Sequence, residues 1–404
     1  MVQLLLRCRP NRSLYRKVRQ FSELDNRAVT IGGDRWWVVT LHRISMQTSS
    51  SSALVLVHGA TGFTGRLICQ SLAKRAIPFA ISGRNKTKLA ELSARFGGVE
   101  SHVVDVTARE SLDRAILGRK IVCAAAGPFV HVGEPMLAAC ANKGVHYVDT
   151  TGEQPFVKLA VERYGAVAEA TGCSIVPAMA YEIAIADWLA SHATSKLGVG
   201  PDELVISYNV SRPATSRGTR RTMLAMLSSD QTKQYVQGTL VHEFIAEHVR
   251  DVKLRGKTMT MVSFPSPEAV VTPTHTRAKT VRTFMRFSPN MAKVMHASRR
   301  LLPSVAPAIA WLMAPIAGSG SEGPDDAARK ATRFDIVCEA SGGGRKVSFS
   351  ISGDDPYGLT GEIQAYAAQC AIDGKISARG VVAPSVAYPA AEAINALQLD
   401  VREL

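Results

Sequence analysis

The sequence predicts an α/β protein in which an N-terminal, doubly wound parallel sheet is followed by a second α+β domain with a mixed sheet. Residues 53–180 alternate short apolar strand patterns with helix patterns, which is typical of parallel strands covered by helices. After about residue 200 the strand patterns become longer. The chain has 404 residues, of which 46% are hydrophobic and 20% charged, enough for a core in each of two domains.

The N-terminal half contains six apolar segments that we expect to form strands, separated by segments with apolar residues at helical spacing. The expected strands are 53–59, 78–84, 101–106, 120–129, 145–153 and 173–179. The expected helices are 64–75, 85–97, 108–118, 133–144 and 153–172. This regular alternation predicts a Rossmann domain over residues 51–190.

The second half has a different texture. The expected strands are 202–210, 258–264, 268–285 and 331–353, the last with a hairpin connection at 340–346. A helix pattern over 360–374 ends at a glycine. We therefore expect an α+β domain for substrate binding or dimerisation over residues 191–385. A C-terminal helix over 386–404 is expected to return to the Rossmann domain.

The formal net charge of +14 is unevenly distributed, because residues 1–45 contain nine Lys/Arg and only three Asp/Glu. This basic stretch fits a disordered leader over 1–50, a targeting segment, or a start codon chosen too early, with Met46 as the alternative start. The body has no dense Lys/Arg stripe interleaved with aromatic residues, so we expect no nucleic-acid partner. Anionic cofactors and lipid headgroups are better partners for such charge.

The seven cysteines include no C-x-x-C pair, and most of them lie in apolar stretches. This usage favours reduced thiols and a cytoplasmic location, with no zinc site. No cluster of metal-ligand residues and no Ser-His-Asp order stands out, so we expect no metal.

Three glycines with the spacing G-x-x-G-x-x-G stand between the first expected strand and its helix. Gly59 allows a tight turn, Gly62 lets a pyrophosphate approach the backbone, and Gly65 lets the helix pack closely on the strand. Backbone N–H groups at the start of the helix then bind phosphate. The expected cofactor contacts in this stretch are Gly59, Thr61, Gly62, Phe63, Thr64 and Gly65. The alternative is a tight strand-to-helix turn without a ligand.

The second expected strand ends in "ISGRNKTK", with no carboxylate at its tip. Folds that bind NAD place Asp or Glu there, whereas folds that bind NADP place an Arg nearby. Arg84, followed by Asn85 and two lysines, therefore predicts NADP(H), although a solvated helix start would have the same composition.

Four further residues complete the expected cofactor site: Ser82, Asp105, Ala126 and Gly127. Asp105 follows the third strand, where it would contact the adenine side or cap the next helix. Ala126 and Gly127 belong to "AAAGPF", whose small residues would let the backbone lie beside the ribose and nicotinamide.

Several motifs together resemble the saccharopine dehydrogenase-like oxidoreductases. They are "GATGFTG", "SGRNKTKL", "AAGPF", "GVHYVDTTGE", "SRGTRRT", "GPDDAAR" and "GDDPYGLT", and they cover about residues 53–395. The resemblance implies an NADPH-dependent enzyme similar to the trans-acting enoyl reductases of lipid, glycolipid and polyketide synthesis, or to the animal proteins found with lipid droplets and membranes. It specifies the family better than the reaction, because "AYEIAIAD" (180–187) departs from the family pattern "GFDSvPsD".

Three functional interpretations follow. The first is reduction of a C=C bond in a lipid-like or polyketide acyl substrate, which an acyl carrier would present. The second is an amino-acid dehydrogenase acting on a C–N bond, which needs cationic groups for carboxylates. The third is a non-catalytic, lipid-associated nucleotide-binding protein.

The candidate proton donors lie beyond the ends of the fifth and sixth strands. They are Tyr147, Tyr181 and Glu182, since a tyrosine or carboxyl group can protonate an enolate after hydride addition. Tyr147 would equally serve as a core ring, and Asp149 and Glu153 as helix-capping acids.

Two further stretches are notable. The basic stretch 211–221 would grip an anionic group or serve as a connector with Thr219 as a helix cap. Residues 301–321 carry no charge and follow a basic helix pattern, which predicts peripheral membrane contact or an acyl pocket through 289–317. A buried hairpin is the main alternative, and three prolines argue against a straight transmembrane helix.

Overall fold

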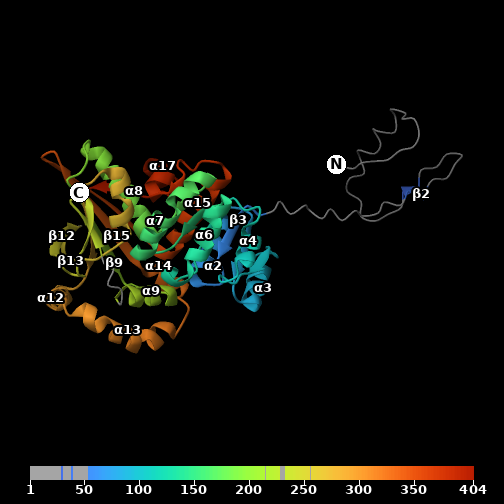
Figure 1. Cartoon of the computed structure of the whole chain (residues 1–404), viewed down its shortest axis with the longest axis horizontal. Coiled ribbons are helices and arrows are strands. Elements are labelled where there is room, and N and C mark those ends of the chain that lie inside the picture. The colour runs from blue at the N-terminus through green and yellow to red at the C-terminus, as the bar shows by residue number, and fades with distance from the viewer. Residues whose placement is uncertain (1–28, 31–37, 40–52, 214, 228–232, 255) are drawn as a thin grey trace. The chain divides into compact units, whose positions relative to one another are not determined.

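The computed structural model describes residues 29–30, 38–39, 53–213, 215–227, 233–254 and 256–404 (Figure 1). The chain divides into two units, Met1–Ser51 and Ser52–Leu404. In the first unit, β1 (Val29–Thr30) pairs antiparallel with β2 (Val38–Val39). The remainder of the leader expected over 1–50 lies outside the described residues.

Within the described part of the second unit, seven parallel strands form one sheet in the order β17-β8-β7-β6-β3-β4-β5. Their bounds are β3 Val55–His58, β4 Phe79–Gly83, β5 Ser101–Val103, β6 Ile121–Ala124, β7 His146–Asp149, β8 Ser174–Val176 and β17 Gly380–Val381. The strand order reverses between β3 and β6, as it does in doubly wound sheets that bind dinucleotides. The predicted Rossmann fold is therefore confirmed.

Successive strand residues point to opposite sides of this sheet. Both faces are apolar, and helices cover both of them. Leu56 and Val122 pack with one helix layer, whereas Val55 and Cys123 pack with the other. The first layer contains α4 Arg109–Ile116, α5 Phe129–Val132, α6 Glu134–Lys143 and α7 Gln154–Thr171. The second contains α2 Phe63–Lys74, α3 Lys86–Arg95, α8 Tyr181–Leu197 and α15 Pro356–Ile372. The second layer lies against the other sheet as well, so one core joins the two halves of the unit.

The second sheet is mixed, as the sequence predicts. Its main path is β11-β10-β14-β9-β15-β16-β18, and β12 and β13 extend it from β14. The bounds are β9 Glu203–Ser211, β10 Lys233–Val236, β11 Thr239–His242, β12 Val249–Leu254, β13 Lys257–Ser263, β14 Thr280–Arg286, β15 Arg333–Gly342, β16 Arg345–Asp354 and β18 Val401–Glu403. Strands β9 and β14 pair in parallel, and the other pairs are antiparallel.

One expected strand is wrong in its first half. Residues 268–285 form α10 (Glu268–Val271) and α11 (Pro273–Thr276) before β14 begins. The strand-forming residues there are overridden by the tertiary context, because Pro273 begins a helical turn and Arg277 ends it in the left-handed conformation, with φ of 57°.

The C-terminal residues contribute to both sheets. The expected boundary at residue 190 falls inside α8. Only β17 joins the parallel sheet, whereas α16 (Pro384–Ala387) and α17 (Ala390–Ala396) pack on α8, and β18 pairs with β16 of the mixed sheet. The helices of the expected C-terminal segment 386–404 therefore pack on α8, which covers the parallel sheet, and its last strand joins the mixed sheet.

The apolar stretch forms a helix on the outside of this unit. α12 (Pro289–Ser298) leads into α13 (Leu302–Gly318), which packs on α9 (Arg217–Leu227) and runs along the outer edge in Figure 1. The exposed large apolar side chains are Met291, Val294, Leu301, Val305, Ile309, Trp311, Leu312 and Met313. The alternative of a buried hairpin is therefore wrong. No helix in the described part of the chain is long and apolar enough to cross a membrane.

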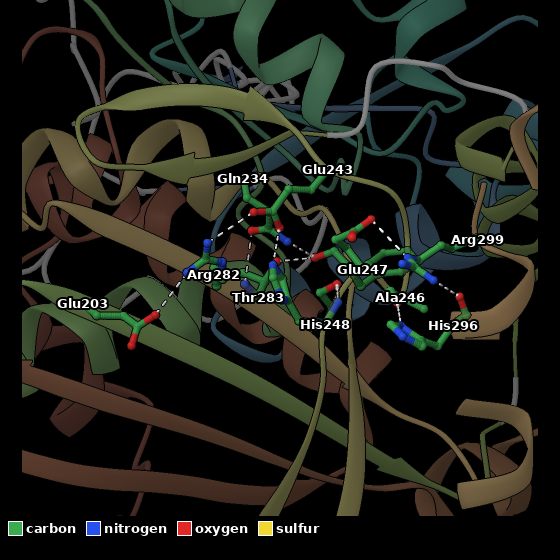
Figure 2. A network of polar contacts seen from close by, with 12 residues as sticks. Glu203, Gln234, Glu243, Ala246, Glu247, His248, Arg282, Thr283, His296 and Arg299 are labelled. Atoms are coloured by element: carbon green, nitrogen blue, oxygen red, sulfur yellow. Dashed lines mark hydrogen bonds and ion pairs between the residues drawn. The ribbon is translucent and has the colours of Figure 1, made fainter. Parts of the chain in front are cut away.

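A polar network holds α12 to the mixed sheet (Figure 2). Arg282 on β14 lies 3.3 Å from Glu243, and Arg299, directly after α12, lies 3.3 Å from Glu247. Both acids belong to the segment between β11 and β12, so this segment ties the helix to the sheet. The short α14 (Asp326–Ala331) then leads the chain back into β15.

Candidate functional site

The turn after β3 has the backbone geometry that requires glycine. Gly59 has φ of 76°, and a Cβ atom there would lie 2.8 Å from the backbone nitrogen of Ala126. A Cβ atom on Gly65 would lie 2.3 Å from the carbonyl oxygen of Gly59. The first glycine therefore permits the close approach of the β6 loop, and the third permits the close approach of α2.

The first turn of α2 is available to an anion. Gly62 is the N-cap residue, and its N–H donates to the carbonyl of Gly59 at 3.0 Å. As far as the structure is described, no side chain caps this helix and its first turn has no acidic residue. Phe63 and Thr64 are half-buried. The unpaired backbone donors and the helix dipole at this end stabilise a phosphate group.

The loop after β6 lies beside this turn, at the point where the strand order reverses. The N–H of Ala125 donates to the carbonyl of His58 at 2.8 Å. Ala126 is half-buried and Gly127 is exposed. In doubly wound sheets a dinucleotide binds in the crevice where the strand order reverses, so these residues would lie beside it.

Ser82 supports the turn from inside the protein. Its carbonyl accepts from the N–H groups of Gly59 and Ala60, and its hydroxyl lies 3.0 Å from Nδ1 of His58. Burial lowers the pKa of His58 to about 4, so the imidazole is neutral near pH 7. The Ser82 side chain is fully buried. The structure thus gives this residue a supporting contact, and a direct cofactor contact by its side chain stays a prediction.

The tip of β4 presents cations, as the sequence indicates. Arg84 is exposed, and the side chain of Asn85 caps α3 by accepting from the N–H of Lys88 at 2.9 Å. Thr61 of the glycine turn is near this tip, because a Cβ atom on Gly83 would lie 3.7 Å from its hydroxyl oxygen. The glycine turn is therefore adjacent to the strand end that Arg84 follows.

Asp105 lies after β5 and organises its own loop. Its carboxylate accepts from the N–H of Thr107 at 2.9 Å and from the Thr107 hydroxyl, and these hydrogen bonds lower its pKa. The N-cap residue of α4 is Ala108, so Asp105 does not cap that helix directly. Its expected contact with the adenine side stays a prediction.

The structure separates the three candidate proton donors. Tyr147 is fully buried in the core between the parallel sheet and the layer of α4 to α7, and burial raises its pKa well above the usual range. Tyr181 and Glu182 are half-buried at the start of α8. The core-ring interpretation of Tyr147 fits its position, and Tyr181 and Glu182 remain together as candidates.

Carboxyl groups gather near the ends of β7 and β8, and we call Asp149, Glu182 and Glu268 the acidic corner. A Cβ atom on Gly152, after β7, would lie 3.9 Å from Oε1 of Glu182. Burial raises the pKa of Asp149 and of Glu182 to about 7. The pKa of Glu268 is raised to about 8, chiefly by burial and also by the negative charges of Asp187 and Glu182. Carboxyl groups with pKa values near neutrality are suited to proton transfer.

Glu268 is a residue that the sequence analysis missed. It is fully buried, and neither of its carboxyl oxygens has a hydrogen-bond partner among the described residues. It belongs to the segment expected as a strand, and it reaches α8 only through the tertiary fold. No local sequence signal marks it.

The carboxylate of Glu153 connects the loop after β6 to α9. Its carboxylate accepts from the N–H groups of Phe129 and Val130 at 2.9 and 2.8 Å and from the hydroxyl of Thr222 at 3.1 Å. The sequence suggests an acid that caps α7, but its side chain caps α5 in the β6 loop instead. Glu153 therefore fixes the loop that contains Ala126 and Gly127.

Two arginines of the basic stretch 211–221 bind backbone. Arg217 donates to the carbonyl of Gly320 at 2.7 Å, and Arg220 donates to that of Ser319 at 2.9 Å. The cap of α9 is the hydroxyl of Ser216, which accepts from the N–H of Thr219 at 3.1 Å. The stretch therefore acts as a clamp on the segment after α13.

Asp187, His275 and Ser385 come together although the sequence shows no such order. Oδ1 of Asp187 lies 2.8 Å from Nε2 of His275, and Oγ of Ser385 lies nearer to the same nitrogen, at 3.1 Å, than to Nδ1, at 3.4 Å. A nucleophilic triad needs the acid and the serine on opposite ring nitrogens. This cluster consequently links α8, α11 and α16 and lacks the arrangement of a nucleophilic triad. In the parts of the chain that the structure describes, no group of three or more metal-ligand side chains forms a metal site.

Comparisons with known proteins agree with this geometry. Residues 55–176 match the model of the family described as saccharopine dehydrogenase NADP binding domain. A trans-acting enoyl reductase of Mycobacterium ulcerans is 30% identical over 143 residues, which are 34% of this chain and 34% of that protein. A saccharopine dehydrogenase-like oxidoreductase of Mus musculus is 28% identical over 163 residues, 35% of this chain and 37% of that protein. The match thus spans about a third of the length of these curated relatives.

The whole fold has a solved counterpart. The apo saccharopine dehydrogenase (L-Glu forming) of Saccharomyces cerevisiae superposes with a TM-score of 0.56 over 87% of this chain and 99% of that chain, at 12% sequence identity. At this identity the similarity shows the fold alone. The glycine turn, the strand order and the family model agree: residues 55–176 are similar to the NADP-binding domain of saccharopine dehydrogenases.

Proposed function

We propose that the protein is an NADPH-dependent oxidoreductase that reduces a carbon–carbon double bond of a lipid-like or polyketide acyl substrate. The observation that carries this proposal is the shared sheet edge. The glycine turn after β3 and the half-buried carboxyl group of Glu182 after β8 lie at the carboxyl ends of strands of one parallel sheet. NADPH, when bound, supplies a hydride. The names of the mycobacterial relatives support an enoyl substrate.

The residues of the acidic corner would supply the matching proton. With hydride from the cofactor at the β-carbon of the enoyl group, Glu182 would give its proton to the α-carbon, and the double bond would become a single bond. Since burial raises the pKa of Glu182 to about 7, a large fraction of it is protonated near neutral pH. Burial raises the pKa of Tyr181 well above its usual range, so its hydroxyl stays available as a hydrogen-bond donor.

The amino-acid dehydrogenase alternative is less well supported. It needs cationic side chains to bind substrate carboxylates, and the candidates were the arginines of 211–221. Arg217 and Arg220 are engaged with backbone carbonyls of residues 319–320. These contacts leave the exposed Arg212 and Arg221 as the remaining cationic candidates of this stretch, so the alternative has fewer groups for substrate carboxylates.

Turnover with defined substrates tests the proposal. Purified full-length protein should oxidise NADPH when a long-chain enoyl thioester is added, and Glu182→Gln should lower kcat by about a hundredfold with unchanged NADPH affinity. Glu362→Gln on α15 is the matched control and should retain full activity. Oxidation of amino-acid substrates by NADP instead would favour the C–N reaction. NADPH binding without turnover of either class would favour the non-catalytic alternative.

We also propose that α13 makes a peripheral contact with an anionic membrane surface. Trp311 and Leu312 are 80% and 67% exposed, whereas Ala306 of the same helix is buried. Residues 301–321 carry no charge, whereas Lys293 and Arg300 are exposed directly before them. An apolar helix surface with basic residues at its end matches the interface of an anionic bilayer.

Vesicle flotation tests this contact. Full-length protein should float with vesicles that contain phosphatidylserine, and less with purely zwitterionic vesicles. A double variant, Trp311→Ser with Leu312→Ser, should stay in the soluble fraction and bind NADPH normally. Leu117→Ser, which changes a leucine that is 78% exposed at the end of α4, is the control and should float like the wild type. Equal flotation of all three proteins would refute the contact. An acyl carrier and a homodimer remain predictions.

A further inference from the structure

Two cations beside the cofactor site converge on one carboxylate. Arg66, in the first turn of α2, lies 2.6 Å through Nη1 from one oxygen of Glu322. Lys88, in the first turn of α3, lies 2.9 Å through Nζ from the other oxygen. The same nitrogen of Arg66 donates to the carbonyl of Thr61 in the glycine turn at 2.7 Å. The carboxylate therefore bridges the starts of two helices that flank the expected cofactor position.

This position is the one that a 2′-phosphate would need. Lys88 follows the tip of β4, where NADP-binding folds hold the phosphate on the adenine ribose. Arg66 and Lys88 are the kind of paired cations that bind such a group. They hold the pKa of Glu322 at about 2 through the hydrogen bonds from Lys88 and Arg66. Glu322 is therefore ionised at physiological pH.

The segment that carries Glu322 is clamped in place. It follows α13, and the carbonyl of Glu322 accepts from the N–H of Arg217 at 3.0 Å. The next residue, Gly323, is packed so closely on Phe63 that a Cβ atom would lie 2.3 Å from the ring. Residues from the second half of the chain thus lie directly on the first turn of α2.

We propose that Glu322 is an internal competitor for the 2′-phosphate of NADP(H), which binds to Arg66 and Lys88 only when the Glu322 carboxylate leaves them. The competition follows from charge, because two cations that are neutralised by a carboxylate attract a phosphate less. NADH has a hydroxyl group in place of this phosphate and does not need the displacement. Glu322 therefore sets the affinity for NADPH without setting that for NADH. The inference rests on NADP(H) as the cofactor.

Nucleotide titration of full-length protein tests the inference. Following nicotinamide fluorescence, we expect Glu322→Gln to lower the Kd for NADPH about tenfold and to leave the Kd for NADH unchanged. Lys88→Met should raise the Kd for NADPH only. Glu362→Gln is the matched control, since Glu362 bridges Lys74 and Arg75 at the other end of α2, and it should bind both nucleotides like the wild type.

Other outcomes would overturn the inference. An unchanged or raised NADPH Kd in Glu322→Gln, while the wild type binds NADPH, would show that Glu322 does not compete, and the cofactor assignment would still stand. An equal gain for NADH would show that the effect acts on the pyrophosphate or the fold and not on the 2′-phosphate. Failure of every protein to bind NADPH would refute the cofactor assignment and the inference together. Competition with 2′,5′-ADP repeats the test without the nicotinamide, and Glu322→Gln should bind this fragment about tenfold more tightly as well.

Discussion

The glycine turn and the acidic corner lie at the same edge of one sheet, yet they are constructed in different ways. The turn comprises eight consecutive residues, 58–65, and two of its three glycines are explained by atoms within the turn or in the neighbouring β6 loop. The acidic corner takes Asp149 from β7, Glu182 from α8 and Glu268 from α10. One region is local in sequence, and the other exists only after the two sheets have packed.

This difference separates binding from chemistry. The backbone of a local turn can bind any pyrophosphate, so the turn identifies a cofactor and not a reaction. The acidic corner takes its side chains from three separate elements, so no single local motif contains it. We expect the second region to act on the substrate, so substitutions in the two regions should have separable effects.

The largest effect is expected in the turn. Gly65→Ala places a methyl group 2.3 Å from the carbonyl oxygen of Gly59, so α2 must shift. We expect a loss of about 3 kcal/mol in the free energy of unfolding and a loss of NADPH affinity of at least about a hundredfold. Urea denaturation and NADPH titration measure the two quantities.

The control for this variant lies in another helix. Gly165→Ala in α7 adds a methyl group with no atom within 4 Å, so the protein should gain up to about 1 kcal/mol and bind NADPH normally. If Gly65→Ala behaved like Gly165→Ala, the close packing of α2 on the turn would be wrong.

A smaller effect with a pH signature is expected in the acidic corner. The pKa of Glu268 is raised to about 8 in the folded protein, so the unfolded chain ionises first as the pH rises above the ordinary value of 4.5. The folded state then holds more protons than the unfolded state, and stability falls between about pH 4.5 and pH 8. Glu268→Gln should reduce this fall, to which Asp149 and Glu182 also contribute, and should stabilise the protein at pH 8 by about 2 kcal/mol or more.

Denaturation curves of both proteins at pH 5 and pH 8 check this effect. Glu91→Gln, an exposed substitution in α3, should change neither value by more than about 0.5 kcal/mol. A wild-type protein that is equally stable at both pH values would contradict the buried, unpaired state of Glu268.

The smallest effect is expected for Glu153, which binds the β6 loop beside the glycine turn. Glu153→Gln keeps the shape of the side chain but can accept less well from the N–H groups of Phe129 and Val130. We expect a loss of about 1 kcal/mol in stability and a threefold to tenfold loss in NADPH affinity, both roughly the size of one charge-assisted hydrogen bond. Asp325→Asn weakens the cap of α14 and should lose stability without losing affinity. If both variants bound NADPH with equal affinity, Glu153 would not contribute to cofactor binding.

The sequence predicts the first region far better than the second. The alternation of strands and helices, the glycine turn and the cations at the β4 tip are local patterns, and the structure shows the strands and helices close to the expected positions. Glu268 and Glu322 could not be predicted, because the first lies in a segment with strand propensity and the second reaches Arg66 across 256 residues of chain. Tyr147 is fully buried among core residues, which its place in a strand pattern did not distinguish from a position at the strand end, and its role as a donor stays a prediction.

The central claim is that NADP(H) binds at the edge formed by the glycine turn and the β4 tip. The most direct test is titration of the full-length protein with NADPH and NADH by nicotinamide fluorescence, on the wild type and on Arg84→Ala. We predict tighter binding of NADPH than of NADH, and a loss of about tenfold for NADPH alone in the variant. Equal affinity for the two nucleotides, or binding of neither, would contradict the account.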